Sequence, residues 1–163
     1  MLAACQNMPE PYAPPVQRQP FENPRPYRIS RVVSMADGDA DAHIVQDIPK
    51  AQGGTWRWTG QKPTLHVAIR TNEKLKFTID YSVPDVTLKD TGPVTIVFFV
   101  NGHEVDRQRQ ATAGEFHFEK PVPAEWINAG QENTVSAEID KVWIAPRDGA
   151  KLGFILTRMG LTQ

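Results

Sequence analysis

The sequence predicts an all-β fold, either a sandwich or a barrel of short strands. Apolar and polar residues alternate in TLHVAIR (residues 64–70) and KFTIDYSV (residues 76–83), and strict alternation is typical of a strand with one buried face. Turn-forming pairs separate such stretches, and Asn101-Gly102 is a strong hairpin signal. Apolar residues at helical spacing reach no further than the single turn Ala124–Ala129. Many short strands at intervals of roughly 8–15 residues are typical of sandwiches and barrels.

The alternation also predicts which side chains face the core. In KFTIDYSV the apolar residues face inward, and Lys76, Thr78, Asp80 and Ser82 face outward. The stretch VTIVFFV is apolar on both faces, so we expect Val94–Val100 to be a central strand that is covered on both faces. Eight residues are expected in the core: Ile79, Tyr81, Ile96, Phe98, Val135, Ile139, Phe154 and Leu156.

Further strands are expected where a short apolar or alternating run lies between turn formers. Pairs such as Asp37-Gly38 and Asp148-Gly149 supply the turns, because these residues adopt tight-turn conformations readily. The expected strands are Arg28–Ser34, His43–Ile48, Thr55–Thr59, Glu104–Arg109, Glu115–Glu119, Asn133–Ile139 and Lys151–Leu161.

Length and charge narrow the classes of function. The 163 residues are enough for one domain, and 18 basic against 19 acidic residues give a formal net charge of -1. A chain this balanced lacks the basic patch that nucleic-acid binding needs, so we expect no nucleic-acid partner. No apolar run approaches the roughly 18 residues that a membrane-spanning helix needs.

The first 28 residues differ in composition from the rest of the chain. Seven of the 14 prolines lie in the first 26 residues, which have almost no periodic apolar pattern. Proline removes backbone donors and favours extended chain, so we expect residues 1–28 to form a tether and residues 29–163 to form the domain. Tyr12, Phe21 and Tyr27 are candidate anchors for a protein partner along this leader.

Two neighbouring stretches resemble the galactose-binding-like jelly rolls, which occur as accessory sugar-binding domains beside bacterial glycosidases. They are VTIVFFVNGHEVDRQRQATAGEFHFEKPVP and the following VPAEWINAGQENTVSAEID, in which Trp126 and Gly130 stand at matching positions. TWRWTGQKPTLHV and PRDGAKLGFILTRMGL also look like jelly-roll domains of bacterial cell-envelope polysaccharide proteins. The resemblance covers roughly Thr55 to Leu161 and implies a jelly-roll β-sandwich of two antiparallel sheets.

The opening Leu2-Ala3-Ala4-Cys5 resembles the lipobox of bacterial lipoproteins. Cys5 is the only cysteine, so it has no partner for an intrachain disulfide. The resemblance implies a lipid on Cys5, attachment to a membrane of the bacterial cell envelope, and, from Gln6, the outer rather than the inner membrane. The alternative is an inert thiol in a disordered tail, because only Met1–Ala4 stand where a signal peptide has about 7–15 apolar residues.

An acidic turn is the only candidate metal site. Asp37, Asp39 and Asp41 alternate in DGDAD, which resembles the start of a calcium loop, but Ala42 and Ile48 stand where an EF-hand has glycine and glutamate. A structural calcium ion is therefore the alternative to a solvated acidic turn, and we expect no other cofactor.

One strand carries residues that could act as acid and base. Glu115, His117 and Glu119 share one face of EFHFE, and paired carboxylates hydrolyse glycosides in many enzymes. An exposed strand face alternates polar residues in any case, and the chain has no GxSxG, P-loop or GxGxxG motif. We therefore expect no enzyme.

The tryptophans are stronger candidates for a binding role. Trp56 and Trp58 are two residues apart and so share a strand face, with Arg57 opposite. Sugars stack their C–H faces on exposed indoles, which makes Trp56 and Trp143 the candidate carbohydrate-binding residues. The resemblance implies that Trp58 and Trp126 pack in the core.

Two functions follow from these observations. We expect a non-catalytic, lipid-anchored accessory subunit of a membrane-associated or surface assembly; the alternative is a carbohydrate-binding module for envelope or extracellular glycans. Tryptophans that line an exposed concave face would favour the glycan, whereas a flat and extensive apolar patch would favour a protein partner.

Lipidation of Cys5 is directly testable. We expect the chain isolated from its native membrane to begin at Cys5 and to carry acyl chains on both sulfur and amine, because two or more chains hold a protein firmly on a bilayer. Intact mass spectrometry measures this modification. An unmodified chain that still carries Met1 would contradict the prediction.

Overall fold

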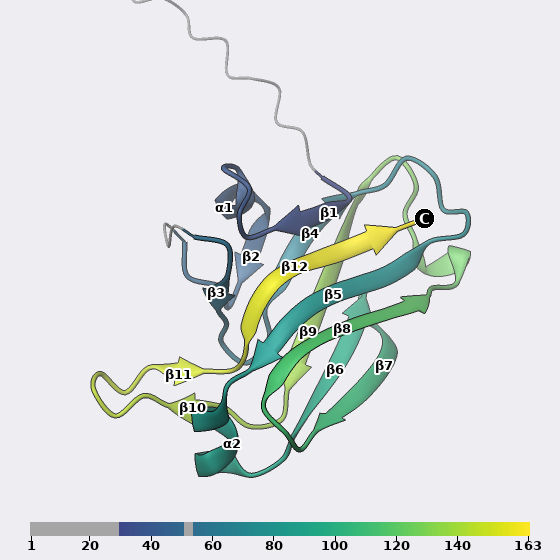
Figure 1. Cartoon of the computed structure of the whole chain (residues 1–163). Coiled ribbons are helices and arrows are strands. Elements are labelled where there is room, and N and C mark those ends of the chain that lie inside the picture. Colours follow the sequence, from purple (N-terminus) through teal and green to yellow (C-terminus); the bar gives the residue numbers. More distant parts are fainter. Residues whose placement is uncertain (1–29, 51–53) are drawn as a thin grey trace, which may run out of the picture.

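Two antiparallel sheets pack face to face in the computed structural model, which describes residues 30–50 and 54–163 (Figure 1). The predicted all-β jelly-roll sandwich is confirmed. The predicted tether and Cys5 lie outside the described residues, and the predicted domain boundary falls at their edge. None of the helices in the described ranges has the length and hydropathy that crossing a membrane would require.

Sheet A carries the candidate site described below. In order, it consists of β1 (Val32–Ser34), β12 (Ile155–Thr162), β5 (Lys76–Val83) and β8 (Gly114–Pro121), with β3 (Arg57–Trp58) also paired to β12. The register of β12 on β5 shifts at a bulge between Leu156 and Arg158. Because β1 and β3 pair with different halves of β12, this strand is flanked on both sides along most of its length.

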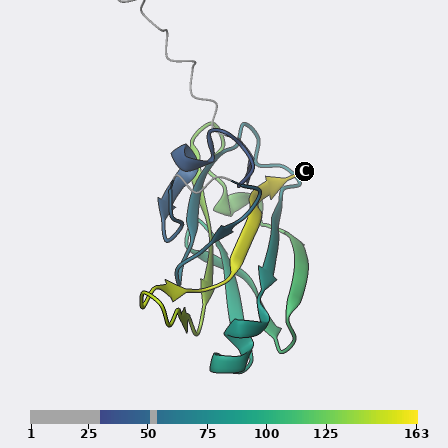
Figure 2. The ribbon, with the colours of Figure 1, turned by 60° about the vertical axis from the view of Figure 1, so that its left-hand side comes forward.

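Sheet B forms the other layer. In order, it consists of β2 (Ile44–Gln46), β4 (Thr64–Ala68), β9 (Glu132–Ile139), β6 (Val94–Val100) and β7 (His103–Gln110). The predicted hairpin between β6 and β7 is confirmed, and both turn residues have positive φ, 48° at Asn101 and 82° at Gly102. Asparagine and glycine tolerate this conformation, which explains the sequence signal. Figure 2 shows the two layers in a turned view.

The core lies between the two sheets. All eight residues that the sequence places in the core are at most 2% exposed. Aromatic rings fill its centre: Phe98 of β6 lies 5.4 Å from Phe77 and 6.0 Å from Tyr81 of β5, and 4.6 Å from Phe118 of β8, measured between ring centroids. Burial raises the pKa of Tyr81, and Gln110 donates a hydrogen bond to its hydroxyl oxygen at 2.8 Å.

The expectation that Val94–Val100 is covered on both faces is wrong in one respect. The strand is central, with β9 and β7 on its two sides, but only alternate residues are fully buried. Val97 and Phe99 on the other face are half-buried, and Phe99 has the ammonium of Lys62 at 4.9 Å from its ring centroid. A single long cationic side chain covers this apolar face in part, where the sequence predicted a packed layer.

The structure contains short elements that the sequence did not reveal. These are α1 (Ala40–His43), α2 (Asp85–Thr91) and the small sheet of β10 (Trp143–Ile144) with β11 (Lys151–Leu152). Helix α2 has local signals, namely Pro84 before it and Gly92 after it at φ 70°, but it lacks an apolar stripe. The strand predicted over Lys151–Leu161 is split at Gly153, where a Cβ atom would lie 2.3 Å from the carbonyl oxygen of Gly60.

The residues that carry the jelly-roll resemblance form one hydrogen-bonded corner. Asn101 donates to the carbonyl oxygen of Trp126 and to Oδ1 of Asn133, both at 2.7 Å, and its own Oδ1 accepts from the amide of Thr134. Asn133 is 1% exposed and also binds both amide and carbonyl of Asn128. The shared motif therefore ties the β6–β7 turn to the start of β9 and supports the fold.

Truncating Phe98, at the centre of the core, should destabilise the folded protein. We expect Phe98→Ala to lower the free energy of unfolding by about 3–5 kcal/mol, because it leaves a cavity among three other aromatic rings. Phe99→Ala, one residue along and facing outward, is the matched control and should cost about 1 kcal/mol. Urea unfolding measures both, and equal losses would contradict the assigned faces.

Candidate functional site

A shallow hollow of about 470 Å³ lies on the outer face of sheet A. In the register of β5 and β8, Asp80 stands opposite His117 and Ser82 stands opposite Glu115. Residues between them, such as Tyr81, face the core, so alternation turns these four polar side chains outward. The lining also includes Thr55, Trp56 and Thr157, together with Tyr81 and Phe116 of the two strands.

Asp80 links the three strands beneath the hollow. Its Oδ1 lies 2.5 Å from Nδ1 of His117 on β8, and its Oδ2 accepts a hydrogen bond from Nε of Arg158 on β12. Burial by itself raises the pKa of Asp80, but the hydrogen bonds from His117 and Arg158 outweigh burial and hold the pKa below its ordinary value of 3.8. The carboxylate is therefore ionised at neutral pH and cross-links β8, β5 and β12.

Other polar side chains of the hollow are available to a ligand. Within the described residues, the side chains of Ser82, Glu115 and Thr157 make no hydrogen bond or ion pair. Hydroxyl and carboxylate oxygens accept hydrogen bonds, and a hydroxyl also donates one. The hollow thus offers both donors and acceptors beside the fixed Asp80–His117 pair.

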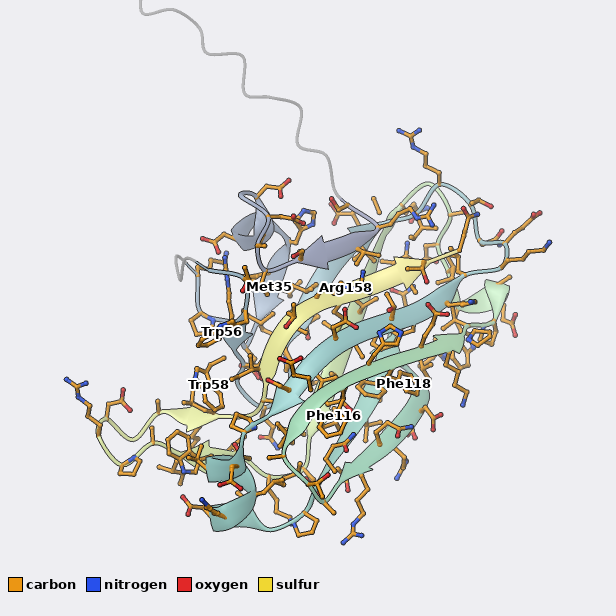
Figure 3. The ribbon with its side chains drawn as sticks, viewed as in Figure 1. Met35, Trp56, Trp58, Phe116, Phe118 and Arg158 are labelled. Carbon is orange, nitrogen blue, oxygen red and sulfur yellow. The ribbon has the colours of Figure 1, made fainter. Side chains whose placement is uncertain are left out.

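Trp56 stands beside a buried arginine in the sequence. Arg57 is 5% exposed, pairs with Asp41 and donates to the carbonyl oxygen of Pro49 at 3.2 Å. The neighbouring Trp56 directly precedes β3 and is 49% exposed. Figure 3 shows Trp56 and Trp58 along the same edge of the domain.

The other tryptophans have structural contacts. Trp143 stacks on Trp58 with ring centroids 6.0 Å apart, and its Nε1 donates to Asp90 at 2.6 Å. It does not line the hollow, so the structure does not bring the two candidate residues Trp56 and Trp143 together in one site. Trp58 and Trp126 are half-buried rather than fully buried, and Trp126 stacks on His103 at 5.0 Å.

The three aspartates proposed for calcium have different roles. Asp37 accepts a hydrogen bond from the amide of Ser34 at 3.1 Å, Asp39 precedes α1, and Asp41 pairs with Arg57. In the described part of the chain, no group of three or more histidine, cysteine or acidic side chains is arranged to hold a metal ion. The structure therefore gives this acidic turn no specific support as a metal site.

Glu115, His117 and Glu119 share the outer face of β8, as the alternation of EFHFE predicts. They differ in their partners, because His117 contacts Asp80 and Glu119 accepts from Lys76 at 2.7 Å. Among the described residues, no hydroxyl is hydrogen-bonded to His117, whose Nδ1 contacts Asp80.

Comparison with known proteins finds only distant structural similarity. No family model matches the sequence, and no curated protein does. Among solved structures, the chain is similar to Xyl-CBM35 in complex with a glucuronic acid containing disaccharide, at 8% identity and TM-score 0.46 over 82% of this chain and 94% of that chain. It is also similar to the CBM36-1 domain of a multidomain xylanase from the hindgut metagenome of Trinervitermes trinervoides, at 12% identity and TM-score 0.41 over 79% and 94%.

A third similar structure belongs to a much longer protein. Dimeric latent PorU from Porphyromonas gingivalis is 14% identical at TM-score 0.40, and the match covers 61% of this chain but only 10% of that chain. Likenesses with TM-scores this low carry no argument about function. The strand pairing within this chain is therefore the basis for the fold, and the hollow is the basis for the function.

Several residues of the hollow were not candidates from the sequence. Asp80 and Ser82 were expected to face outward, but the sequence does not indicate that β8 lies beside them. Thr157 reaches the hollow at the bulge of β12, which no local pattern signals. The alternating patterns of β5 and β8 were the available signal, and only their pairing turns them into one site.

The charged link at Asp80 predicts a pH-dependent stability. Because the pKa of Asp80 is lower in the folded state, its stabilising contribution is fully present above its ordinary pKa of 3.8 and is lost as pH falls through the lower folded value. We expect Asp80→Asn to be less stable than the wild type at about pH 7 and the difference to shrink by about pH 3.

Urea unfolding at the two pH values measures this difference. Glu125→Gln is the control, because Glu125 is an exposed carboxylate without an ion pair in the described structure, and its stability should follow the wild type at both pH values. A stability difference for Asp80→Asn that is the same at neutral and acid pH would contradict the assignment.

Proposed function

We propose that the domain binds glycans on the outer face of sheet A, with the hollow beside Trp56 as the binding site. The observation that carries the proposal is a half-exposed indole and unpartnered hydroxyl and carboxylate groups around one hollow. An indole packs against the apolar C–H face of a sugar, and the polar groups bind sugar hydroxyls. This proposal adopts the alternative that the sequence left open.

The distribution of exposed apolar residues also supports a glycan over a protein partner. In the described residues, the large exposed hydrophobic side chains are Val45, Trp56, Val86 and Ile144. They belong to four different segments, β2, the residues before β3, α2 and β10, and only Trp56 lines the hollow. The accessory-subunit hypothesis depends mainly on the Pro-rich leader, which lies outside the described residues.

We propose further that the module is non-catalytic and is attached to a bacterial envelope membrane through Cys5. The support comes from the sequence, namely the resemblance of Leu2-Ala3-Ala4-Cys5 to a lipobox and the proline-rich stretch that follows it. In this arrangement the leader would hold the glycan-binding domain at a distance from the lipid surface.

Glycan binding can be tested with the full chain on a microarray of neutral, acidic and amino-sugar oligosaccharides. We expect binding to at least one class, and calorimetry with that oligosaccharide should show affinity about tenfold weaker or worse for Trp56→Ala, because the stacking surface is lost. Thermal unfolding checks that the variant is folded.

Ile144→Ala is the matched control, because Ile144 is 59% exposed and lies on the β10–β11 hairpin, away from the hollow lining. Its affinity should equal that of the wild type. A wild-type chain that binds no glycan would refute the function, and an affinity that Trp56→Ala leaves unchanged would refute the site.

A further inference from the structure

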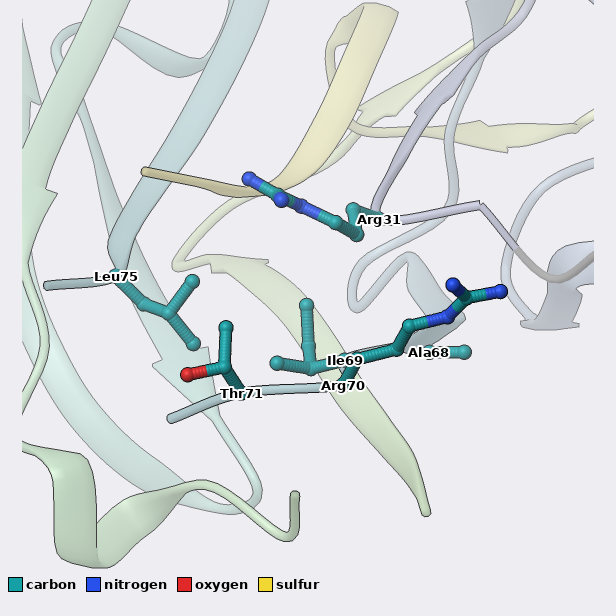
Figure 4. A pocket seen from close by; sticks show the side chains of 6 residues that line it. All are labelled: Arg31, Ala68, Ile69, Arg70, Thr71 and Leu75. Atoms are coloured by element: carbon teal, nitrogen blue, oxygen red, sulfur yellow. The ribbon is translucent and has the colours of Figure 1, made fainter. Parts of the chain in front are cut away.

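A second hollow, of about 230 Å³, lies between β1 and the loop that joins β4 to β5. Figure 4 shows Arg31 on one side of it and the segment Ala68–Thr71 on the other, with Leu75 beside them. It shares no lining residue with the hollow beside Trp56. Its chemistry is also different, because two arginine residues are part of a mainly apolar lining.

The two arginines have no acidic partner in the described structure. Arg31 donates from Nη1 to the neutral side-chain oxygen of Gln163 at 3.1 Å, and Arg70 makes no side-chain hydrogen bond or ion pair within the described residues. Both side chains are exposed. Two arginines therefore line one hollow, and neither forms an ion pair with a carboxylate of the described residues.

The floor of the hollow is apolar and fixed. Ile69 and Leu75 are each 1% exposed and belong to the core. Backbone hydrogen bonds hold both of them, since the carbonyl oxygen of Ile69 accepts from Gly130 at 2.7 Å and that of Leu75 accepts from Val122 at 2.9 Å. Thr71 adds a hydroxyl, whose oxygen accepts from the amide of Glu73 at 3.3 Å.

From this arrangement we propose that the hollow binds a phosphate group that is carried on an apolar moiety. Guanidinium groups bind phosphate oxygens through charge-assisted, often bidentate hydrogen bonds. Two of them match the charge of about -1.5 to -2 on a phosphate monoester at neutral pH, and the Thr71 hydroxyl adds a donor. The apolar part lies against Ala68 and the aliphatic stems of the two arginines, above the closed floor of Ile69 and Leu75.

The volume of the hollow limits the size of the ligand that it can bind. Ligand pockets usually measure about 300–1,000 Å³, so this smaller hollow accepts a head group rather than a whole large ligand. The phosphate could belong to a lipid head group or to a soluble phosphate ester. The proposal does not depend on glycan binding.

Calorimetry with the full chain tests the site, with hexyl phosphate and inorganic phosphate as probes. We expect hexyl phosphate to bind more tightly, because only it has an apolar chain that can lie against Ala68 and the arginine stems. Arg31→Gln and Arg70→Gln should each weaken hexyl phosphate binding at least about tenfold. Arg147→Gln, on the β10–β11 hairpin, removes the same charge from an exposed site outside the hollow and should bind as the wild type does.

Vesicles of phosphatidylcholine, with and without phosphatidic acid, identify the source of the phosphate. Co-sedimentation that needs phosphatidic acid and both arginines would support the proposal with a lipid head group as the ligand. Hexyl phosphate binding without co-sedimentation would support it with a soluble ester. The proposal is overturned if hexyl phosphate does not bind saturably, or if it binds equally to the wild type and both hollow variants.

Discussion

The packing of aromatic rings between the two sheets is the contact on which the candidate binding face depends. Phe98 of sheet B lies against Phe77 and Phe118 of sheet A, which commits one face of β5 and one face of β8 to the core. Because side chains alternate, Asp80 and His117 must then face outward and meet in register. A slip of one residue in either strand would bury these polar groups and expose the rings. The same contact that stabilises the sandwich therefore assembles the hollow.

Much of the fold was accessible from the sequence because its signals are local. The alternation of KFTIDYSV predicted the bounds of β5, and the apolar run VTIVFFV predicted those of β6, as the structure has them. All eight expected core residues are buried. The Asn101-Gly102 signal is equally local, since it reflects backbone conformations that two residues adopt by themselves. The jelly-roll resemblance rests on Asn101 and Trp126, whose hydrogen-bonded corner is part of the scaffold, and so it predicted the fold and not the site.

The site was less accessible because it depends on pairing between distant segments. Ser82 and Glu115 are opposite each other only because β8 pairs with β5, and Thr157 joins them through a bulge in β12. Trp56 was identified as a candidate because an indole two residues from another in a strand has a definite face. Trp143 was also a candidate, but its contacts with Trp58 and Asp90 occupy it, and sequence spacing contains no information about those partners.

The two hollows differ in how much conformational entropy their side chains would lose when a ligand binds. Beside Trp56, Asp80 holds His117 in place on the paired strands, and two of the unpartnered groups are the short side chains of Ser82 and Thr157, so a ligand has few long side chains to order. Arg31 and Arg70 are long, exposed side chains, and ordering them costs roughly 0.5–1.5 kcal/mol each. Charge attraction must offset that cost. Salt screens exposed charges, so it should weaken ligand binding at the hollow beside Arg31 and Arg70 far more than at the hollow beside Trp56.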